Sequence, residues 1–206
     1  MTSIASVTLE VPDPSAAGPF YAAAFGLNGR LGLRAASDTS ARSQGFRGFT
    51  LSLVVARPAI VDGFVGAALE AGATALKPVK KSLWGYGGVV SAPDGTIWKV
   101  ATAKKKASGP ATREIDDVVL LLGVADVAAS KQFYVDHGFE VARSFGRKYV
   151  EFAAGPGSAV KLALYGRGAL AKDAGVAADG TGSHRLAIRS DAGTFTDPDG
   201  FVWEAA

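Results

Sequence analysis

The sequence contains no cysteine, no long uninterrupted apolar run and no hydrophobic leader. Without cysteine, no disulfide framework can stabilise the chain. A helix that spans a bilayer needs roughly 18 or more apolar residues in succession, and no stretch here approaches that length, so we expect no membrane contact. Residues Met1 to Ser6 lack the basic start and long hydrophobic core of a signal peptide. We therefore expect a cytoplasmic protein.

The sequence contains one uninterrupted run of three basic residues. The 206 residues carry a formal net charge of +3, and 48% of them are apolar, a composition typical of a globular protein with an ordinary core. The basic run Lys104-Lys105-Lys106 stands among Gly, Ser and Pro residues. Such a run is typical of a solvated linker. We therefore expect no nucleic-acid partner.

Two short motifs occur twice, in the same order. The closing motif is a Pro-Asp-Gly turn between apolar runs, at Pro93-Asp94-Gly95 and at Pro198-Asp199-Gly200, and each copy predicts a β-hairpin. The opening motif is an aspartate that can cap a helix, followed by a Phe-Tyr pair before a glycine. Its copies are Asp13 with Phe20-Tyr21 and Asp126 with Phe133-Tyr134. The repeated order indicates a duplication.

The repeat predicts an α+β protein of two domains, residues 1–103 and 114–206, joined by a Lys/Gly/Pro linker at 104–113. The two halves are shortened at different places. The first is short between the strand predicted at Leu31 to Ala35 and the strand that begins at Phe49. The second lacks a helix and a strand before its terminal hairpin. Because each half keeps elements that the other lacks, we expect the halves to dock on each other.

The sequence indicates where two helices and one strand begin or end. Gly18-Pro19 interrupts the first helix, so it either kinks there or begins at Pro19. The clearest helix begins at Pro58 and ends at Gly72, because its apolar residues fall on one stripe. A strand is predicted from His184 to Ile188, with His184 on the same face as Ile188.

The strand, the capping aspartate, the helix with Phe-Tyr and the closing Pro-Asp-Gly hairpin together resemble the vicinal oxygen chelate superfamily. This is the group of glyoxalase, bleomycin-resistance and extradiol-dioxygenase proteins. The resemblance covers most of both halves and implies duplicated βαβββ modules. It also implies that the modules pair, so that two curled mixed sheets form cups that hold a small molecule. Fold alone does not fix the chemistry.

Metal-dependent members of this group place His on the first strand of each paired module and Glu near the ends of the closing strands. In the first half the matching positions are Ser6 and Lys99, which cannot bind a metal in that way. In the second half the resemblance assigns Val119 to one such position and Lys161 to another.

Only two second-half residues retain the metal-binding type, His184 and Glu204, and a bulge could add Asp117. The interpretation we favour is therefore a metal-free protein without a cofactor, glyoxalase/bleomycin-resistance-like, that binds an aromatic or hydrophobic metabolite or antibiotic. The alternative is a lyase, isomerase or dioxygenase with one divalent metal ion held by these three residues. A third alternative is a regulatory or structural module. No catalytic residue is assigned.

The candidate ligand-binding residues are all aromatic or basic. Trp84 and Tyr86 stand on a Gly-rich approach to a strand, where aromatic side chains can form the wall of an apolar pocket. Tyr149, Lys161 and Arg185 complete this set. We also expect the Lys161 ammonium to face Glu204. The expected partner is a small molecule, and a homodimer is left open.

Overall fold

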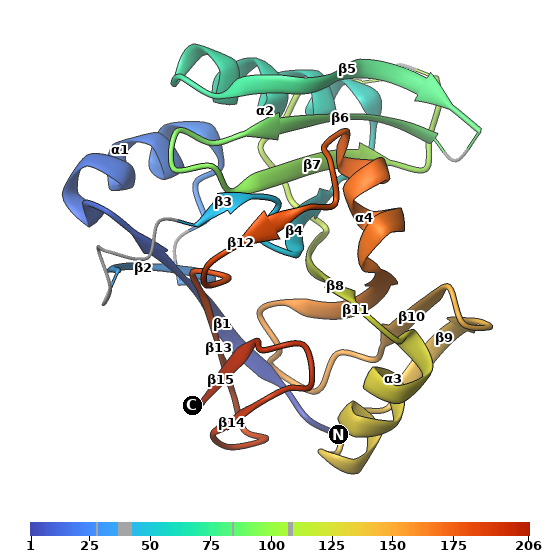
Figure 1. The fold of residues 1–206 in the computed structure, drawn as a ribbon. Coiled ribbons are helices and arrows are strands. Elements are labelled where there is room, and N and C mark those ends of the chain that lie inside the picture. The colour runs from blue at the N-terminus through green and yellow to red at the C-terminus, as the bar shows by residue number, and fades with distance from the viewer. Residues whose placement is uncertain (28, 37–42, 84, 107–108) are drawn as a thin grey trace.

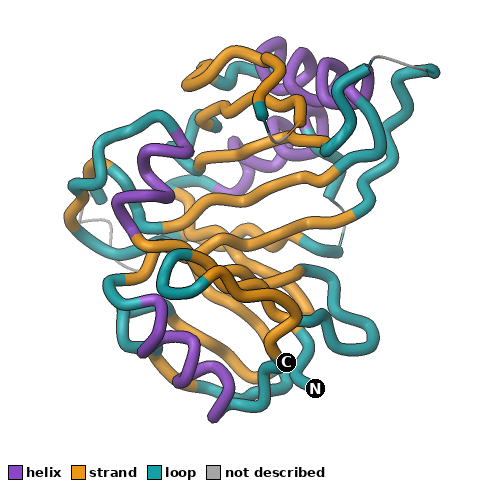
Figure 2. Tube along the Cα trace, turned by 90° about the vertical axis from the view of Figure 1, so that its right-hand side faces the viewer, coloured by secondary structure: helices purple, strands orange, loops and turns teal. Residues whose placement is uncertain are grey.

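The computed structural model describes residues 1–27, 29–36, 43–83, 85–106 and 109–206. In these ranges the chain forms an eight-stranded sheet, a five-stranded sheet and a small two-stranded sheet, with four helices (Figure 1). The expected α+β class is confirmed. Figure 2 shows the strands crossing the middle of the molecule and the helices lying toward its periphery. None of the described helices is long and apolar enough to cross a membrane.

The eight-stranded sheet contains two complete βαβββ modules. The first consists of β4 (Phe49–Val54), α2 (Pro58–Glu70), β5 (Thr74–Ser82), β6 (Gly85–Ser91) and β7 (Ile97–Thr102). The second consists of β8 (Asp117–Val124), α3 (Val127–Asp136), β9 (Val141–Phe145), β10 (Tyr149–Phe152) and β11 (Lys161–Gly166). Their order is β5-β6-β7-β4-β8-β11-β10-β9. The first strands of the two modules, β4 and β8, are therefore antiparallel neighbours at the centre of the sheet.

The five-stranded sheet contains the two shortened modules. It combines β1 (Ile4–Val11), α1 (Pro14–Ala24) and β2 (Leu31–Ala35) with β13 (Leu186–Ser190), β14 (Phe195–Thr196) and β15 (Val202–Ala205). Its order is β14-β15-β13-β1-β2. The remaining elements are α4 (Arg167–Ala174) and the pair of β3 (Gln44–Gly45) with β12 (Gly180–Thr181). The segments shortened in the two halves thus meet in one sheet, which leaves the other sheet complete.

Each large sheet takes strands from both halves of the chain. The antiparallel pair β1–β13 joins the first and last modules, and β4–β8 joins the two middle ones. The docking expected for the halves therefore takes the form of shared sheets. Two domains at residues 1–103 and 114–206 remain a prediction.

Local chemistry explains where several elements begin and end. The Asp13 carboxylate accepts hydrogen bonds from the N–H groups of Ser15 and Ala16, so α1 begins at Pro14 and continues past Pro19. The expected alternative, a start at Pro19, is wrong. The strand expected from His184 begins instead at Leu186, because Arg185 has a φ of 52°, outside extended geometry.

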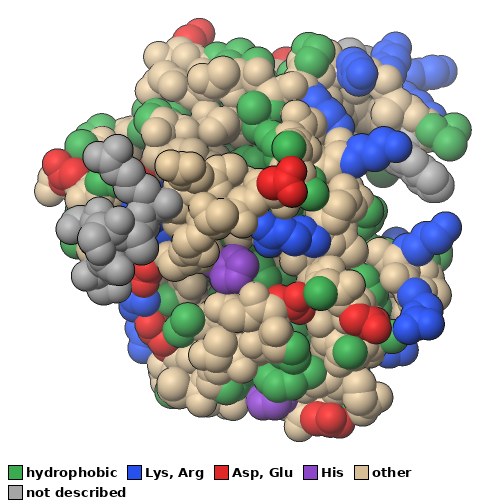
Figure 3. All heavy atoms as spheres, viewed as in Figure 1, with side chains coloured by type: hydrophobic (Ala, Val, Ile, Leu, Met, Phe, Trp, Pro, Cys, Tyr) green, Lys and Arg blue, Asp and Glu red, His purple; other side chains and the backbone are tan. Residues whose placement is uncertain are grey.

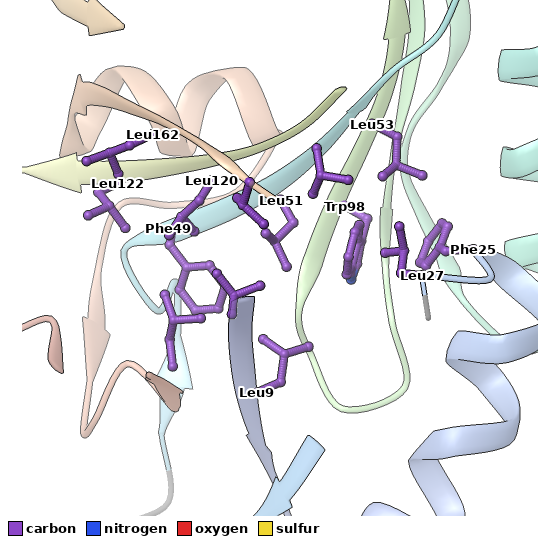
Figure 4. Packing of buried hydrophobic residues seen from close by; sticks show 14 of the residues in the cluster. Leu9, Phe25, Leu27, Phe49, Leu51, Leu53, Trp98, Leu120, Leu122 and Leu162 are labelled. Carbon is purple, nitrogen blue, oxygen red and sulfur yellow. The ribbon is translucent and has the colours of Figure 1, made fainter. Parts of the chain in front are cut away.

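The main core lies between the two large sheets and under their helices. Leu51 and Leu53 of β4 and Leu120 of β8 point to the same side as Leu9 of β1 (Figure 4). All four are completely buried. The helices α1 and α2 close this core, and Phe25 of the segment after α1 stacks on Trp98, with ring centroids 4.5 Å apart. One face of the eight-stranded sheet is therefore committed to the core.

The two repeated motifs contact each other. The Tyr21 hydroxyl of α1 donates a hydrogen bond to the Asp94 carboxylate in the β6–β7 turn, at 3.0 Å. The Tyr134 hydroxyl of α3 donates to the buried Asp197 carboxylate at the β14–β15 turn. Burial raises the pKa of both tyrosines, so each hydroxyl keeps its proton as a donor. In each half, this contact joins a helix of one sheet to a hairpin of the other.

Replacing Asp197 should change how stability depends on pH. Burial raises the pKa of Asp197 above its ordinary value. Its protonation therefore favours the folded state below the unfolded pKa of about 3.9, and this contribution is lost as pH rises through the folded pKa. We expect the unfolding free energy of the wild type minus that of Asp197→Asn to become smaller as pH rises across that window. Urea unfolding from about pH 3 to about pH 6 measures this difference. A pH-independent difference would contradict this.

Residues 1–103 and 112–206, expressed separately, should not fold independently. In the intact chain β1 pairs with β13 and β4 pairs with β8, so each fragment lacks a neighbouring strand in both large sheets. Each fragment alone therefore has open strand edges and an uncovered core face. We expect noncooperative unfolding of either fragment alone, and a cooperative one-to-one complex when the two are mixed, measured by circular dichroism and light scattering. The expectation fails if each fragment is monomeric and as stable as the intact chain.

Candidate functional site

Four side-chain positions form a row across the centre of the eight-stranded sheet. Ser52 of β4 is paired with Lys99 of β7 on one side and with Val119 of β8 on the other. Val119 is in turn paired with Lys161 of β11. Paired residues on neighbouring strands point to the same face. We call this face, opposite the core, the cup face.

A cavity of about 420 Å³ lies on the cup face of the first complete module. Its apolar part includes Val54, Val89 and Ala101, from three adjacent strands. Lys99, at one end of the row, also lines it, as does Asp173 of α4. The space-filling view shows the molecule hollowed at its right-hand side, with Lys and Arg side chains above and below the hollow (Figure 3).

Each lysine of the row has an aspartate beside it. The Lys99 ammonium lies 2.7 Å from the Asp173 carboxylate, and the Lys161 ammonium lies 2.8 Å from Asp117. These side chains are between 33% and 41% exposed, so solvent screens both pairs. Lys77 adds a further contact, because its ammonium donates to the carbonyl oxygens of Lys172 and Asp173 at the end of α4.

Helix α4 covers part of the cup face. Leu170 of α4 is fully buried in a cluster with Phe46 and with Val89 of β6. Gly123 of β8 lets the helix approach closely, since a Cβ there would lie 3.3 Å from the Leu170 side chain and 3.2 Å from the Arg167 Cα. The open cavity is the space that α4 leaves beside β6 and β7.

Tyr149 lies on the second complete module. Its hydroxyl donates to the Glu151 carboxylate at 3.1 Å, and its ring packs edge-on against Tyr165 with centroids 4.9 Å apart. Burial, followed by the charge of Glu151, raises the pKa of Tyr149. Tyr149 is therefore a neutral hydrogen-bond donor. It lies on β10, the strand next to β11, which carries Lys161.

Tyr86 is among the residues that line the cavity, whereas Arg185 lies elsewhere. The Tyr86 hydroxyl donates to Asp62 of α2, at 2.8 Å, so this side chain points to the helix-covered side of the sheet. Arg185 donates through Nε to the Ser43 hydroxyl and precedes β13 of the other sheet. Trp84 lies outside the described residues.

The three residues of the metal alternative do not come together. His184 stacks on Phe201, its Nε2 lies 3.0 Å from the Asp199 carbonyl oxygen, and its Nδ1 faces the Arg47 carbonyl oxygen. Both ring nitrogens are thus occupied by the backbone. Glu204 belongs to the five-stranded sheet, whereas Asp117 belongs to the eight-stranded one.

The expectation that Lys161 faces Glu204 is wrong. Lys161 pairs with Asp117, and Glu204 accepts from Arg34 at 2.6 Å. Arg34 also binds Glu10, at 2.7 Å. The physical reason is the pairing of modules: the residues of the second half are divided between two sheets, so they do not share one cup.

The row does not fit a divalent metal ion. Such an ion requires several neutral nitrogen or anionic oxygen ligands that converge. The four positions offer one hydroxyl at Ser52, an apolar side chain at Val119 and two ammonium groups that would repel a cation. Within the described ranges, no group of three or more His, Asp and Glu side chains could hold a metal ion.

Ser52 is the position that sequence reasoning missed. The resemblance assigns the corresponding position in the first half to Ser6, which lies on the five-stranded sheet instead. The available signal was the alternation in β4, where Thr50 and Ser52 interrupt the apolar residues at every second position. That pattern indicates a strand with one polar face, but not which strand it pairs with.

Comparison with known proteins shows the fold. No protein-family model matches the sequence, and no curated protein matches it significantly. Among solved structures, glyoxalase I from Zea mays is 15% identical, with a TM-score of 0.64, and the match covers 98% of this chain and 91% of that one. A putative dioxygenase from Bacillus subtilis is 13% identical, with a TM-score of 0.54, over 96% of this chain and 71% of that one.

These likenesses confirm the resemblance predicted from the repeated motifs at the level of the fold. The protein has the vicinal oxygen chelate fold, the architecture of glyoxalase, bleomycin-resistance and dioxygenase proteins. At this identity they do not carry an activity over to this chain.

Removing the Lys161 side chain should change stability little. The Lys161–Asp117 pair is about one-third exposed at both ends, and exposed pairs contribute about 0 to 1 kcal/mol. We expect Lys161→Ala to lower the unfolding free energy by no more than about 1 kcal/mol, measured by urea unfolding. A loss of about 3 kcal/mol or more would instead identify a buried pair.

Proposed function

We propose that the protein is a glyoxalase/bleomycin-resistance-like binding protein that holds a small organic molecule on the cup face without a metal ion. The observation that carries the proposal is the cavity of about 420 Å³ beside Lys99. A volume of about 300 to 1,000 Å³ with a largely apolar lining and a few polar groups is typical of small-molecule sites. Val54, Val89 and Ala101 supply apolar surface of this kind.

The donor set supports binding without a metal. At the row, fixed ammonium groups stand where a metal ion would need ligands, so the positive charge comes from the protein itself. Lys99 and Lys161 are each held by an aspartate, which fixes their direction. An organic ligand that enters the cavity therefore meets preformed donors.

Another cavity supports the proposal less well. A cleft of about 570 Å³ beside His184 is lined largely by residues 178–182. The Arg167 guanidinium that lines it already donates to the carbonyl oxygens of Phe46 and Ala178. Arg167 is thus engaged in holding the loops together, although one guanidinium nitrogen of Arg47, which also lines the cleft, has no hydrogen-bond partner among the described residues. In the same part of the chain the Lys99 ammonium donates to one carboxylate only, that of Asp173, and retains free donors.

Blocking the cavity should abolish ligand binding. We expect aromatic compounds from a screen to raise the melting temperature of the wild type by about 5 to 10 °C at a hundredfold excess over Kd. Ala101→Trp should remove this shift, because the indole would occupy the cavity between Val54 and Gly87. Ala22→Trp, at an exposed position of α1, is the matched control and should keep it.

The metal-free part of the proposal has its own readout. The ligand-induced shift should be unchanged after treatment with a chelator and after addition of Zn²⁺ or Mn²⁺. Stoichiometric metal in the purified protein would contradict the metal-free proposal. A shift that the chelator removes and the metal restores would contradict it as well. A shift that survives in Ala101→Trp would move the binding site elsewhere.

A further inference from the structure

We infer that the molecule bound on the cup face is a planar aromatic compound with an anionic group, which the lysines around the cavity hold. This inference rests on the proposed function and narrows it to one chemical class. It is carried by the charge of the cavity wall and by the shape of its floor.

The wall of the cavity is positively charged. Three lysines line it, Lys77, Lys80 and Lys99, against a single acidic residue, Asp173. A lysine ammonium has three N–H donors. Among the described residues, Lys99 donates only to Asp173, and Lys80 forms no ion pair. Both side chains therefore offer unused donors. The charge of Lys99 is balanced by Asp173, so the excess positive charge of the wall comes from Lys77 and Lys80.

The floor of the cavity is flat and apolar. Gly87 of β6 is paired with Ala101 of β7, and Ala101 is paired with Val54 of β4. Two of these three neighbouring positions carry no side chain or only a methyl group. A planar ring can therefore lie against the sheet there, in contact with Val89 at its edge, and bury apolar surface without displacing a side chain.

The distance between Ala101 in the apolar floor and the ammonium-bearing Lys99 matches the length of a single aromatic acid. Lys99 and Ala101 are on the same strand and face, two residues apart, which corresponds to about 7 Å along the strand. An aromatic acid spans this distance, with its ring over Ala101 and its anionic group toward Lys99 and Lys80. Figure 3 shows Lys and Arg side chains above and below the hollow at the right-hand side of the molecule, and positive charge so placed would attract an anion.

The test compares 2-naphthoate with its neutral amide, 2-naphthamide, by calorimetric titration of the full-length protein. We expect the acid to bind at least about tenfold more tightly than the amide, because a hydrogen bond to a charged group is stronger than one to a neutral group. The affinity for the acid should also fall as NaCl concentration rises, and that for the amide should not.

Variants locate the charge. Lys80→Glu should weaken 2-naphthoate binding by about tenfold or more and leave the amide unchanged. Lys99→Met should act in the same direction. Lys131→Glu on α3 makes the same change of net charge on the opposite side of the sheet and should alter affinity less than about twofold. Ala101→Trp should abolish binding of both compounds.

The outcomes separate this inference from the proposed function. Equal affinity for acid and amide, with both lost in Ala101→Trp, would overturn the anionic class and leave the binding function intact. The same holds if Lys131→Glu weakens the acid as much as Lys80→Glu. If no compound of any class shows binding that Ala101→Trp abolishes, the proposed function fails, and the inference fails with it.

Discussion

The antiparallel pairing of β4 with β8 determines where the residues of the row on the cup face lie. Ser52 opposite Val119 fixes the register between the two complete modules. Each module then adds its own fourth strand in parallel, and Lys99 and Lys161 take the outer places of the row. A slip of one residue would turn every one of these side chains into the core and bring Leu51 and Leu120 to the surface. The buried leucines therefore hold the cup face in place.

The second organising feature is the contact between the repeated motifs. Tyr21 and Tyr134 each connect a helix to an aspartate in a hairpin turn of the other sheet. Aromatic packing surrounds both contacts, with Trp98 beside Phe25 and Trp203 beside Tyr134. The same contact thus occurs once in each half, and each copy connects the two sheets. The two motifs that repeat in the sequence are therefore the two partners of this contact.

Much of the fold could be predicted from the sequence, because its signals are local. The Asp126 cap, the Pro58 helix start and the Pro-Asp-Gly hairpins each depend on a few neighbouring residues. Lys99, Val119 and Lys161, which the resemblance selected, lie with Ser52 in one row across the sheet. Their partners could not be predicted, since strand pairing over long distances leaves no local pattern. For this reason His184 and Glu204 were grouped with residues of another sheet, and Ser52 was missed.

The pairing of the first module with the last has a consequence for synthesis of the chain. The strands β4 to β11 can complete the eight-stranded sheet once residue 166 has left the ribosome. Strand β1, made first, must wait for β13 and β15 before its sheet closes. Contacts of such high sequence separation form slowly, and open strand edges favour aggregation. Strand β1, with its buried Val7 and Leu9, therefore keeps one edge unpaired until β13 has been synthesised.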